Sequence, residues 1–217
     1  MSEYRLPAGA LLAGIVVLGA VAVAAHPAPF AIDSAMLYDA LSARTPAVTS
    51  AAEFLSLLFS PVAMLAWIAA AAISLVAVDR NWFRAIQLVA VCGVAAVVTE
   101  AIKWLVDRPR PGSSFRVDEA ESAMSYPSGH VSGTAALAFG LVFVVGAAWP
   151  KWAQAIAALA ALAFTTLCAA TRVYLGAHWV TDTIAGGLLG LAAALAVPPL
   201  VTSTLDRMSS APARLRA

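Results

Sequence analysis

Charged side chains are scarce in this chain. Only 12% of its 217 residues are Asp, Glu, Lys or Arg, whereas 62% are hydrophobic; soluble domains carry about 25% charged residues. The formal net charge of +1 provides no broad positive surface, so bulk charge gives no reason to expect a nucleic-acid partner. The composition is instead typical of an integral membrane protein.

Cysteine and metal-binding patterns are equally sparse. The two cysteines, Cys92 and Cys168, each fall inside an apolar run, so we expect buried free thiols rather than a disulfide or metal ligands. There is no HExxH pattern, and the acidic residues 118–121 predict a solvated loop, with a calcium or magnesium site as the alternative. We therefore predict that the protein uses no metal and no other cofactor.

Long apolar runs fill most of the chain. Six of them approach or exceed the length that crosses about 30 Å of hydrocarbon at about 1.5 Å per residue. They cover roughly residues 6–25, 54–78, 85–102, 131–149, 152–170 and 179–201. The prediction is an all-α, six-transmembrane-helix bundle that forms a single domain over residues 1–217. The first run also has some features of a signal peptide, but we favour a retained helix, because five remaining spans would leave the termini on opposite sides.

The segment between the first two runs has a different character. Asp33 is placed to cap a short helix that continues to Arg44, with Met36 and Leu37 on its apolar face. This pattern predicts a helix lying in the membrane interface; an ordered loop is the alternative.

The distribution of Lys and Arg predicts the orientation in the membrane. With six spans, seven cations fall on the side of the two termini. Only three remain on the other side once Lys103, Arg110 and Arg172 are set aside as ligand-binding residues. The positive-inside rule then places both termini in the cytoplasm. The excess of Arg over Lys, with abundant Ala, suggests a high-GC genome and hence a bacterial plasma membrane.

Three polar stretches interrupt the apolar chain, at residues 103–111, 126–130 and 171–182. The first ends the third predicted helix, the second opens the fourth, and the third joins the fifth to the sixth. Because consecutive spans cross the membrane in alternating directions, all three stretches fall on the same side of it. The predicted orientation makes this the extracytoplasmic side. Ionisable residues beside lipid-length helices point to a functional site.

The third stretch contains a histidine and an aspartate four residues apart. On a helix, His178 and Asp182 would lie on the same face. A carboxylate that accepts from one imidazole nitrogen fixes the tautomer and leaves the other nitrogen available as a nucleophile. A chance pairing at a membrane interface is the alternative for this pair taken alone.

The second stretch combines a glycine, a serine and a histidine at the start of a helix. The backbone amides of Ser128 and Gly129 are suited to an anion, and a glycine lets the main chain approach a phosphoryl oxygen. His130 is placed to give a proton to a departing oxygen. The alternative is a serine helix cap followed by a solvated histidine.

Cations near these histidines suit phosphate chemistry. Lys103, Arg110 and Arg172 would stabilise the negative charge that spreads over the oxygens of a phosphoryl group in transfer. For Arg108 and Arg116, contact with lipid headgroups is an equally good reading. Glu100 lies one helical turn before Lys103 and is expected to pair with it.

These segments resemble the type 2 phosphatidic acid phosphatase family, also called lipid phosphate phosphatases, whose pattern is Lys-x6-Arg-Pro, Pro-Ser-Gly-His and Ser-Arg-x5-His-x3-Asp. Lys103 and Arg110 match the first motif, and residues 127–130 match the second in full.

The third motif matches at Arg172, His178 and Asp182, with Thr171 where the family usually has serine. The hydroxyl group is kept, so the departure concerns geometry rather than chemistry. The motifs span residues 103–182, and the six-helix layout extends the resemblance to nearly the whole chain.

The resemblance implies a two-step mechanism without a metal. His178 attacks phosphorus to form a phosphohistidine, His130 protonates the leaving oxygen and then activates water, and Asp182 orients His178. The residues implied to hold the phosphate oxygens are Lys103, Arg110, Ser128, Gly129 and Arg172.

The implied substrate is a lipid phosphate in the bilayer. The family also contains soluble vanadate haloperoxidases, but six spans favour a lipid. A polyprenyl diphosphate such as undecaprenyl diphosphate is the leading expectation, followed by phosphatidic acid and phosphatidylglycerophosphate. A lipid-linked phosphotransferase would keep the same residues, and a non-enzymatic membrane transporter is the remaining alternative. The sequence leaves the oligomeric state open.

Overall fold

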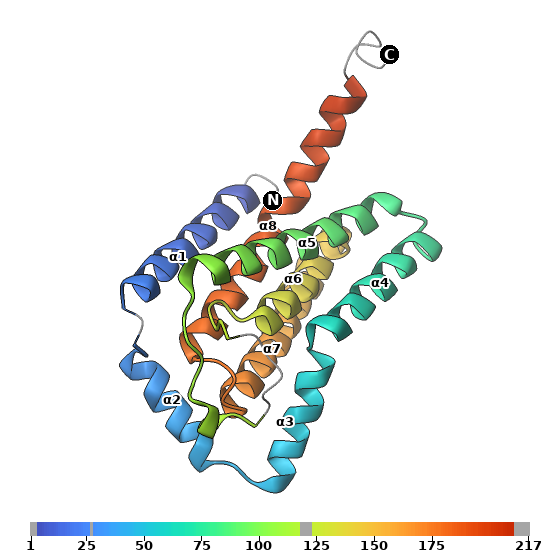
Figure 1. Ribbon diagram of the computed structural model, residues 1–217. Coiled ribbons are helices and arrows are strands. Elements are labelled where there is room, and N and C mark those ends of the chain that lie inside the picture. The colour runs from blue at the N-terminus through green and yellow to red at the C-terminus, as the bar shows by residue number, and fades with distance from the viewer. Residues whose placement is uncertain (1–3, 27, 118–122, 211–217) are drawn as a thin grey trace.

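The computed structural model describes residues 4–26, 28–117 and 123–210. These residues fold into eight α-helices and two short 3-10 helices (Figure 1). The elements are α1 (Arg5–Ala25), α2 (Ala31–Ser42), α3 (Pro46–Leu58), α4 (Pro61–Ala77), α5 (Trp82–Val106), η1 (Ser113–Phe115), α6 (Gly129–Val144), η2 (Gly146–Ala148), α7 (Lys151–Tyr174) and α8 (Val180–Ser210). The predicted all-α class is confirmed.

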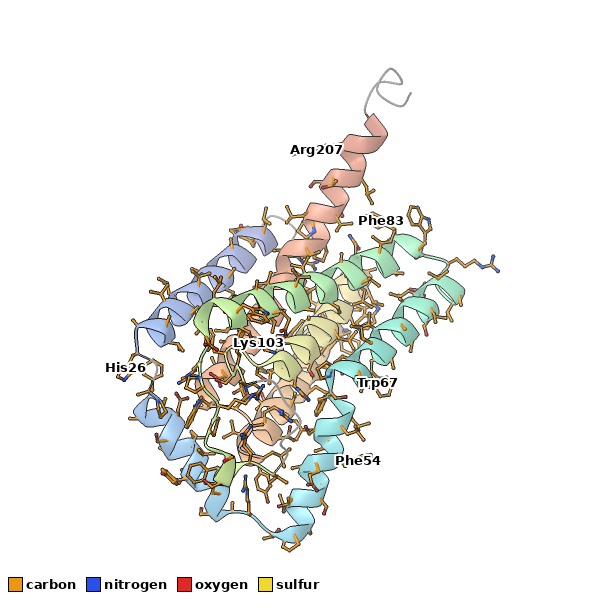
Figure 2. All side chains as sticks on the ribbon, in the orientation of Figure 1. His26, Phe54, Trp67, Phe83, Lys103 and Arg207 are labelled. Atoms are coloured by element: carbon orange, nitrogen blue, oxygen red, sulfur yellow. The ribbon has the colours of Figure 1, made fainter. Side chains whose placement is uncertain are left out.

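Several of these helices are suited to a membrane. In the described chain, α1, α5, α7 and α8 are each long and apolar enough to cross it, and the bent pair α3–α4 would make a fifth span. Helix α6 is apolar but has only 16 residues. Phe54 of α3 and Trp67 of α4 point away from the bundle (Figure 2) and are 61% and 50% exposed. Apolar side chains on the outside are expected where lipid, rather than water, surrounds the protein. The structure thus has the character of an integral membrane protein, with four to five spans by length and composition.

The second predicted run does not form one straight helix. The chain breaks between α3 and α4, and the two helix axes differ by 52°. Ser60 is the N-cap of α4, because its side chain accepts from the amide of Ala63 at 3.2 Å, and Pro61 occupies the first helical position. Proline has no N–H and its ring clashes with the carbonyl four residues earlier, so it starts a helix here rather than continuing one.

Helix α6 lies among the other helices and packs most extensively against α8, with α5 and α7 on its other sides. Two glycines of α8 permit the close approach. A methyl group on Gly186 would lie 2.6 Å from the carbonyl oxygen of Ser128, and one on Gly190 would lie 2.5 Å from that of Ser132. The short α6 is therefore enclosed by protein rather than by lipid.

The two ends of the bundle differ. The start of α1 and the end of α8 lie at the same end of the molecule (Figure 1). There, Arg5 at the start of α1 donates to the carbonyl of Phe143 near the end of α6 at 3.1 Å. The opposite end holds the C-termini of α5 and α7 and the N-termini of α6 and α8. All three polar stretches therefore lie at the end remote from the termini.

Two smaller expectations have clear outcomes. Cys92 and Cys168 are buried free thiols, as predicted. The helix before Arg44 exists as α2, but it begins at Ala31, so Asp33 stands at its third position rather than before it. Asp33 accepts from the amide of the N-cap residue Phe30 at 3.1 Å and is completely buried, so it caps the helix start from within the first turn.

Candidate active site

Backbone hydrogen bonds join the three polar stretches. The amide of Ser125 donates to the carbonyl of Arg108 at 2.9 Å, and the amide of Ser128 donates to the carbonyl of Asp182 at 3.0 Å. The indole of Trp179 donates to the carbonyl of Pro109 at 2.9 Å. Residues separated by up to 70 positions are thus held in fixed register at one end of the bundle.

A turn at a glycine sets the direction of the chain in the third stretch. Gly176 has φ +69, and a methyl group there would lie 2.3 Å from the carbonyl oxygen of Phe115. Only glycine tolerates both the left-handed conformation and this contact. Arg44 secures the same turn by donating to the carbonyls of Tyr174 and Phe115 at 2.7 Å. The loop that carries His178 is therefore rigidly placed.

His178 lies between a cation and a carboxylate. Its Nε2 is 3.0 Å from Nη1 of Arg110, and its Nδ1 is 3.5 Å from Oδ2 of Asp182. A guanidinium can only donate, so Nε2 must accept and the ring proton must be on Nδ1. This tautomer leaves the lone pair on Nε2, which is the atom that a phosphoryl acceptor requires.

The charge state of His178 is set mainly by burial. The side chain is 1% exposed, and burial lowers its pKa from 6.5 to about 3. Within this net shift, Asp182 opposes the lowering of the pKa, and Arg110 and Arg172 contribute to it. His178 is consequently a neutral imidazole at pH 7, and its lone pair is on Nε2.

Arg110 keeps its charge in spite of partial burial. Burial lowers its pKa from 12.5 to about 10, with Asp182 opposing and Arg116 adding to the shift. At neutral pH the guanidinium is therefore protonated, and it donates to the carbonyl of Ala177 at 2.6 Å as well as to His178.

Asp182 is fully buried and satisfied by several donors. Its Oδ2 accepts from the amide of Trp179 at 3.0 Å, and its Oδ1 accepts from Arg108 at 2.5 Å. Together these contacts fix the carboxylate next to the imidazole. The i, i+4 relationship expected from sequence is retained, although Trp179 starts the turn and α8 proper begins at Val180.

The first and second stretches meet at Lys103. Its Nζ donates to Glu100 at 2.8 Å, as expected, and a methyl group on Gly129 would lie 3.4 Å from it. The hydroxyl of Ser128 is buried and makes no hydrogen bond within the described part of the chain. A buried hydroxyl without a partner is uncommon, and it leaves a donor available for an anion beside Gly129 and Lys103.

Arg172 and Thr171 end α7. Arg172 is 1% exposed and its Nη1 donates to the hydroxyl of Ser56 on α3. Its carbonyl accepts from the amide of His178 at 3.3 Å. Thr171 donates within its own helix to the carbonyl of Cys168 at 2.7 Å, so this hydroxyl has a structural partner.

His130 lies in the first turn of α6, two residues after Ser128, and is 8% exposed. Of the eight residues selected from sequence for catalysis and phosphate binding, all lie at this end of the bundle; Figure 2 shows nitrogen and oxygen atoms gathered below Lys103. In the described chain no group of three or more His, Cys, Asp or Glu side chains is placed to hold a metal. The acidic residues 118–121 lie outside the described residues.

Sequence reasoning missed two residues, Asp33 and Arg108. Arg108 does not extend to lipid headgroups: its side chain is 0% exposed and pairs with both Asp33, at 2.7 Å, and Asp182. The partners are 75 and 74 residues away, so no local pattern links them. The position of Arg108 within the first polar stretch was the only available signal.

Comparisons with known proteins bear on the family of the chain. Residues 84–204 match the PAP2 superfamily. An undecaprenyl-diphosphatase from Sulfolobus acidocaldarius is 31% identical over 128 residues, which are 57% of this chain. The match spans 58% of that relative's length.

Two solved structures share the fold. The transmembrane PAP2-type phosphatidylglycerolphosphate phosphatase from Bacillus subtilis superposes with a TM-score of 0.76 at 23% identity, covering 92% of this chain and 96% of that one. LpxE from Aquifex aeolicus superposes with a TM-score of 0.57 at 19% identity, covering 80% and 96%. Since the superfamily match covers more than half of the chain and includes all three polar stretches, this protein belongs to the PAP2 superfamily.

Proposed function

We propose that this protein is a metal-independent lipid phosphate phosphatase that acts through a phosphohistidine on His178. The observation that carries the proposal is the state of the imidazole. It is neutral, its Nε2 accepts from Arg110, and its Nδ1 faces the carboxylate of Asp182. A buried histidine held in this tautomer is prepared to attack an electrophile.

The first step forms a bond between Nε2 of His178 and phosphorus, while the bond from phosphorus to the leaving oxygen breaks. His130 gives its proton to that oxygen. The phosphorylated imidazole is positively charged, and the carboxylate of Asp182 stabilises it. In the second step water attacks phosphorus, His130 takes a proton from it, and the bond to Nε2 breaks to release phosphate.

The cations and the helix start hold the phosphoryl oxygens. Lys103, Arg110 and Arg172 supply positive charge, and the amides of Ser128 and Gly129 and the hydroxyl of Ser128 supply hydrogen bonds. Such donors are most effective when they are fixed before the reaction. Their attachment to helix ends and backbone hydrogen bonds provides that rigidity.

An apolar cavity beside the site supports a lipid substrate. It has a volume of about 740 Å³ and lies among α2, α3, α6, α7 and α8, with Leu55, Leu162 and Leu188 in its wall. Thr171 and Thr183, the chain neighbours of Arg172 and Asp182, also line it. A phosphate at His178 could thus be continuous with a hydrocarbon chain in this cavity. Its size is within the usual range for ligand pockets, about 300–1,000 Å³.

We further propose six membrane spans, with α3–α4 counted as one bent span and α6 as a short span enclosed by protein. Both termini would then be cytoplasmic and the site extracytoplasmic, in a bacterial plasma membrane. The arrangement of the termini and the polar stretches at opposite ends of the bundle is consistent with this orientation.

A polyprenyl diphosphate such as undecaprenyl diphosphate is the substrate we propose. The similarity to an undecaprenyl-diphosphatase supports it, whereas the fold similarity to a phosphatidylglycerolphosphate phosphatase keeps phosphatidylglycerophosphate and phosphatidic acid as alternatives. A lipid-linked phosphotransferase differs only in the second acceptor.

The test is phosphate release by the detergent-purified protein in the presence of a chelator. Undecaprenyl diphosphate, phosphatidic acid and phosphatidylglycerophosphate are offered side by side, with His178→Ala as the control. We expect release that persists in chelator, is lost in the variant and is fastest with undecaprenyl diphosphate. No release from any of the three lipids would contradict phosphatase activity, and transfer of the labelled phosphoryl group to an added sugar or lipid would identify a transferase.

A further inference from the structure

A buried chain of charges runs from helix α2 to the proposed nucleophile. Arg108 donates to Oδ2 of Asp33 at 2.7 Å and to Oδ1 of Asp182 at 2.5 Å, and all three side chains are 0% exposed. Thr181 completes the cluster, since its amide and hydroxyl donate to Oδ1 of Asp33 at 2.9 and 2.8 Å. The guanidinium also lies 5.7 Å from the ring centroid of Trp179.

The net charge of this cluster determines how much negative charge faces His178. Asp182 must remain anionic toward His178 so that it stabilises the positive imidazole of the intermediate. Arg108 alone would compensate the charge of Asp182 almost completely, because the pair is in contact and away from water. Asp33 supplies a second carboxylate on the other side of the guanidinium. The triad then has a net charge of −1, which leaves negative charge facing His178.

We propose that Asp33 is a positioning residue of the active site, which holds Arg108 and offsets its charge, so that Asp182 stays fixed and presents net negative charge to His178. This inference rests on the proposed phosphatase function. Asp33 lies outside the PAP2 match at residues 84–204, so the N-terminal segment contributes to the site from beyond the part that identifies the family.

The ion pair alone does not explain the burial of the Asp33 carboxylate. A buried ion pair is seldom required for stability, because desolvation offsets most of its attraction. A cluster of one guanidinium and two carboxylates is better explained by what it does to the carboxylate next to His178.

The first experiment compares the full-length wild type with Asp33→Asn on the same lipid phosphate. We expect kcat to fall about tenfold, a loss of about 1.4 kcal/mol in transition-state stabilisation, while KM and the inhibition constant of inorganic phosphate stay the same. Unchanged phosphate inhibition shows that the site is folded and still binds the anion. An unchanged kcat, or a parallel change in all three constants, would overturn the proposal.

Asp79→Asn is the matched control. Asp79 pairs with Arg84 at 3.2 Å in the connection between α4 and α5, at the other end of α5 from Lys103, and its side chain is 38% exposed. Loss of such an exposed pair has little effect on stability, and we expect wild-type kcat.

The double variant Asp33→Asn with Arg108→Gln tests whether Asp33 acts through Arg108. Once the guanidinium is gone, Asp182 is no longer neutralised, so the double variant should recover part of the kcat that Asp33→Asn loses. If Asp33 only supports the structure, removal of a second buried partner of Asp182 should bring no recovery of kcat. A double variant slower than Asp33→Asn would therefore overturn the proposal.

Misfolding of Asp33→Asn and failure of the proposed function can be told apart in the same series. If Asp33→Asn does not fold, Arg108→Lys replaces it. An ammonium keeps the charge but cannot bind both carboxylates as a guanidinium does, so kcat should fall at constant KM; an unchanged kcat would overturn the proposal. Absence of phosphate release by the wild type would instead be a failure of the proposed function.

Discussion

The guanidinium of Arg110 lies 3.0 Å from Nε2 of His178, the atom that must attack phosphorus in the proposed reaction. Without a substrate, this contact fixes the tautomer but also occupies the nucleophilic lone pair. Arrival of a phosphate offers Arg110 a stronger partner, because a charge-assisted bond to a phosphoryl oxygen exceeds one to a neutral imidazole. Substrate binding would thus release the nucleophile and place the cation on the group to be transferred.

Arg110→Gln should therefore reduce kcat/KM by about 100-fold or more, comparable with the removal of one fixed donor from a charge-stabilising site. Steady-state phosphate release measures the effect. Arg84→Gln, at the other end of α5, is the control and should stay near the wild type. A loss of less than about threefold in Arg110→Gln would show that this guanidinium does not touch the transferred group.

The charge of His178 should not change across the physiological pH range. Its pKa is lowered from 6.5 to about 3, chiefly by burial, so the imidazole gives up its proton at lower pH than usual and stays neutral from about pH 5 upward. The ring signal of labelled histidine, assigned by its loss in His178→Gln, should show no titration between about pH 5 and 8. A midpoint near 6.5 would contradict the buried, neutral nucleophile.

Lys103 and its neighbour Glu100 should behave differently on substitution. The side chain of Lys103 is 10% exposed and lies beside Gly129, whereas that of Glu100 is 59% exposed. Lys103→Met should raise the inhibition constant of inorganic phosphate at least tenfold, because a fixed cation at the anion site is lost. Glu100→Gln removes a largely solvated partner and should change this constant by no more than about threefold. Equal effects of the two variants would argue against Lys103 as a phosphate ligand.

The close packing of α6 against Gly190 of α8 should contribute to the thermal stability of the protein. Gly190→Ala places a methyl group 2.5 Å from the carbonyl oxygen of Ser132 and 2.6 Å from Cβ of Ala135, and overpacking of this kind costs about 1–3 kcal/mol. Gly93→Ala on α5 is the matched control, since nothing lies within 4 Å of its added methyl group. Thermal unfolding in detergent should show a lower midpoint for Gly190→Ala only; equal midpoints would mean that the helices can separate without loss.

The sequence allowed most of the helices to be predicted, because lipid-length apolar runs have few alternatives to a helix. The predicted third run, residues 85–102, corresponds to α5 (Trp82–Val106) and the first, residues 6–25, to α1 (Arg5–Ala25). The break at Ser60 and Pro61 was overlooked, although serine followed by proline is a typical helix start. Because the residues on both sides of the break are apolar, the sequence predicts one continuous run across it.

Residues in the three polar stretches could be selected from their spacing, but their long-range partners could not. Ser56 meets Arg172 from α3, and Asp33 meets Arg108 from α2. Both partners come from the segment before the motifs, and each would look like an ordinary helix residue in isolation. Which face of α2 or α3 turns toward the site depends on tertiary packing, and sequence periodicity alone does not specify it.

The most direct test of the account is to trap the covalent intermediate. Rapid quenching of the wild-type protein with radiolabelled lipid phosphate should give an acid-labile, base-stable phosphoprotein, and the label should map to Nε2 of His178 in the peptide that contains it. Once formed, the label should persist longer in His130→Ala, because the water that would hydrolyse it is no longer activated. Steady phosphate release by the wild type with no label at His178, or release that continues in His178→Ala, would contradict the account.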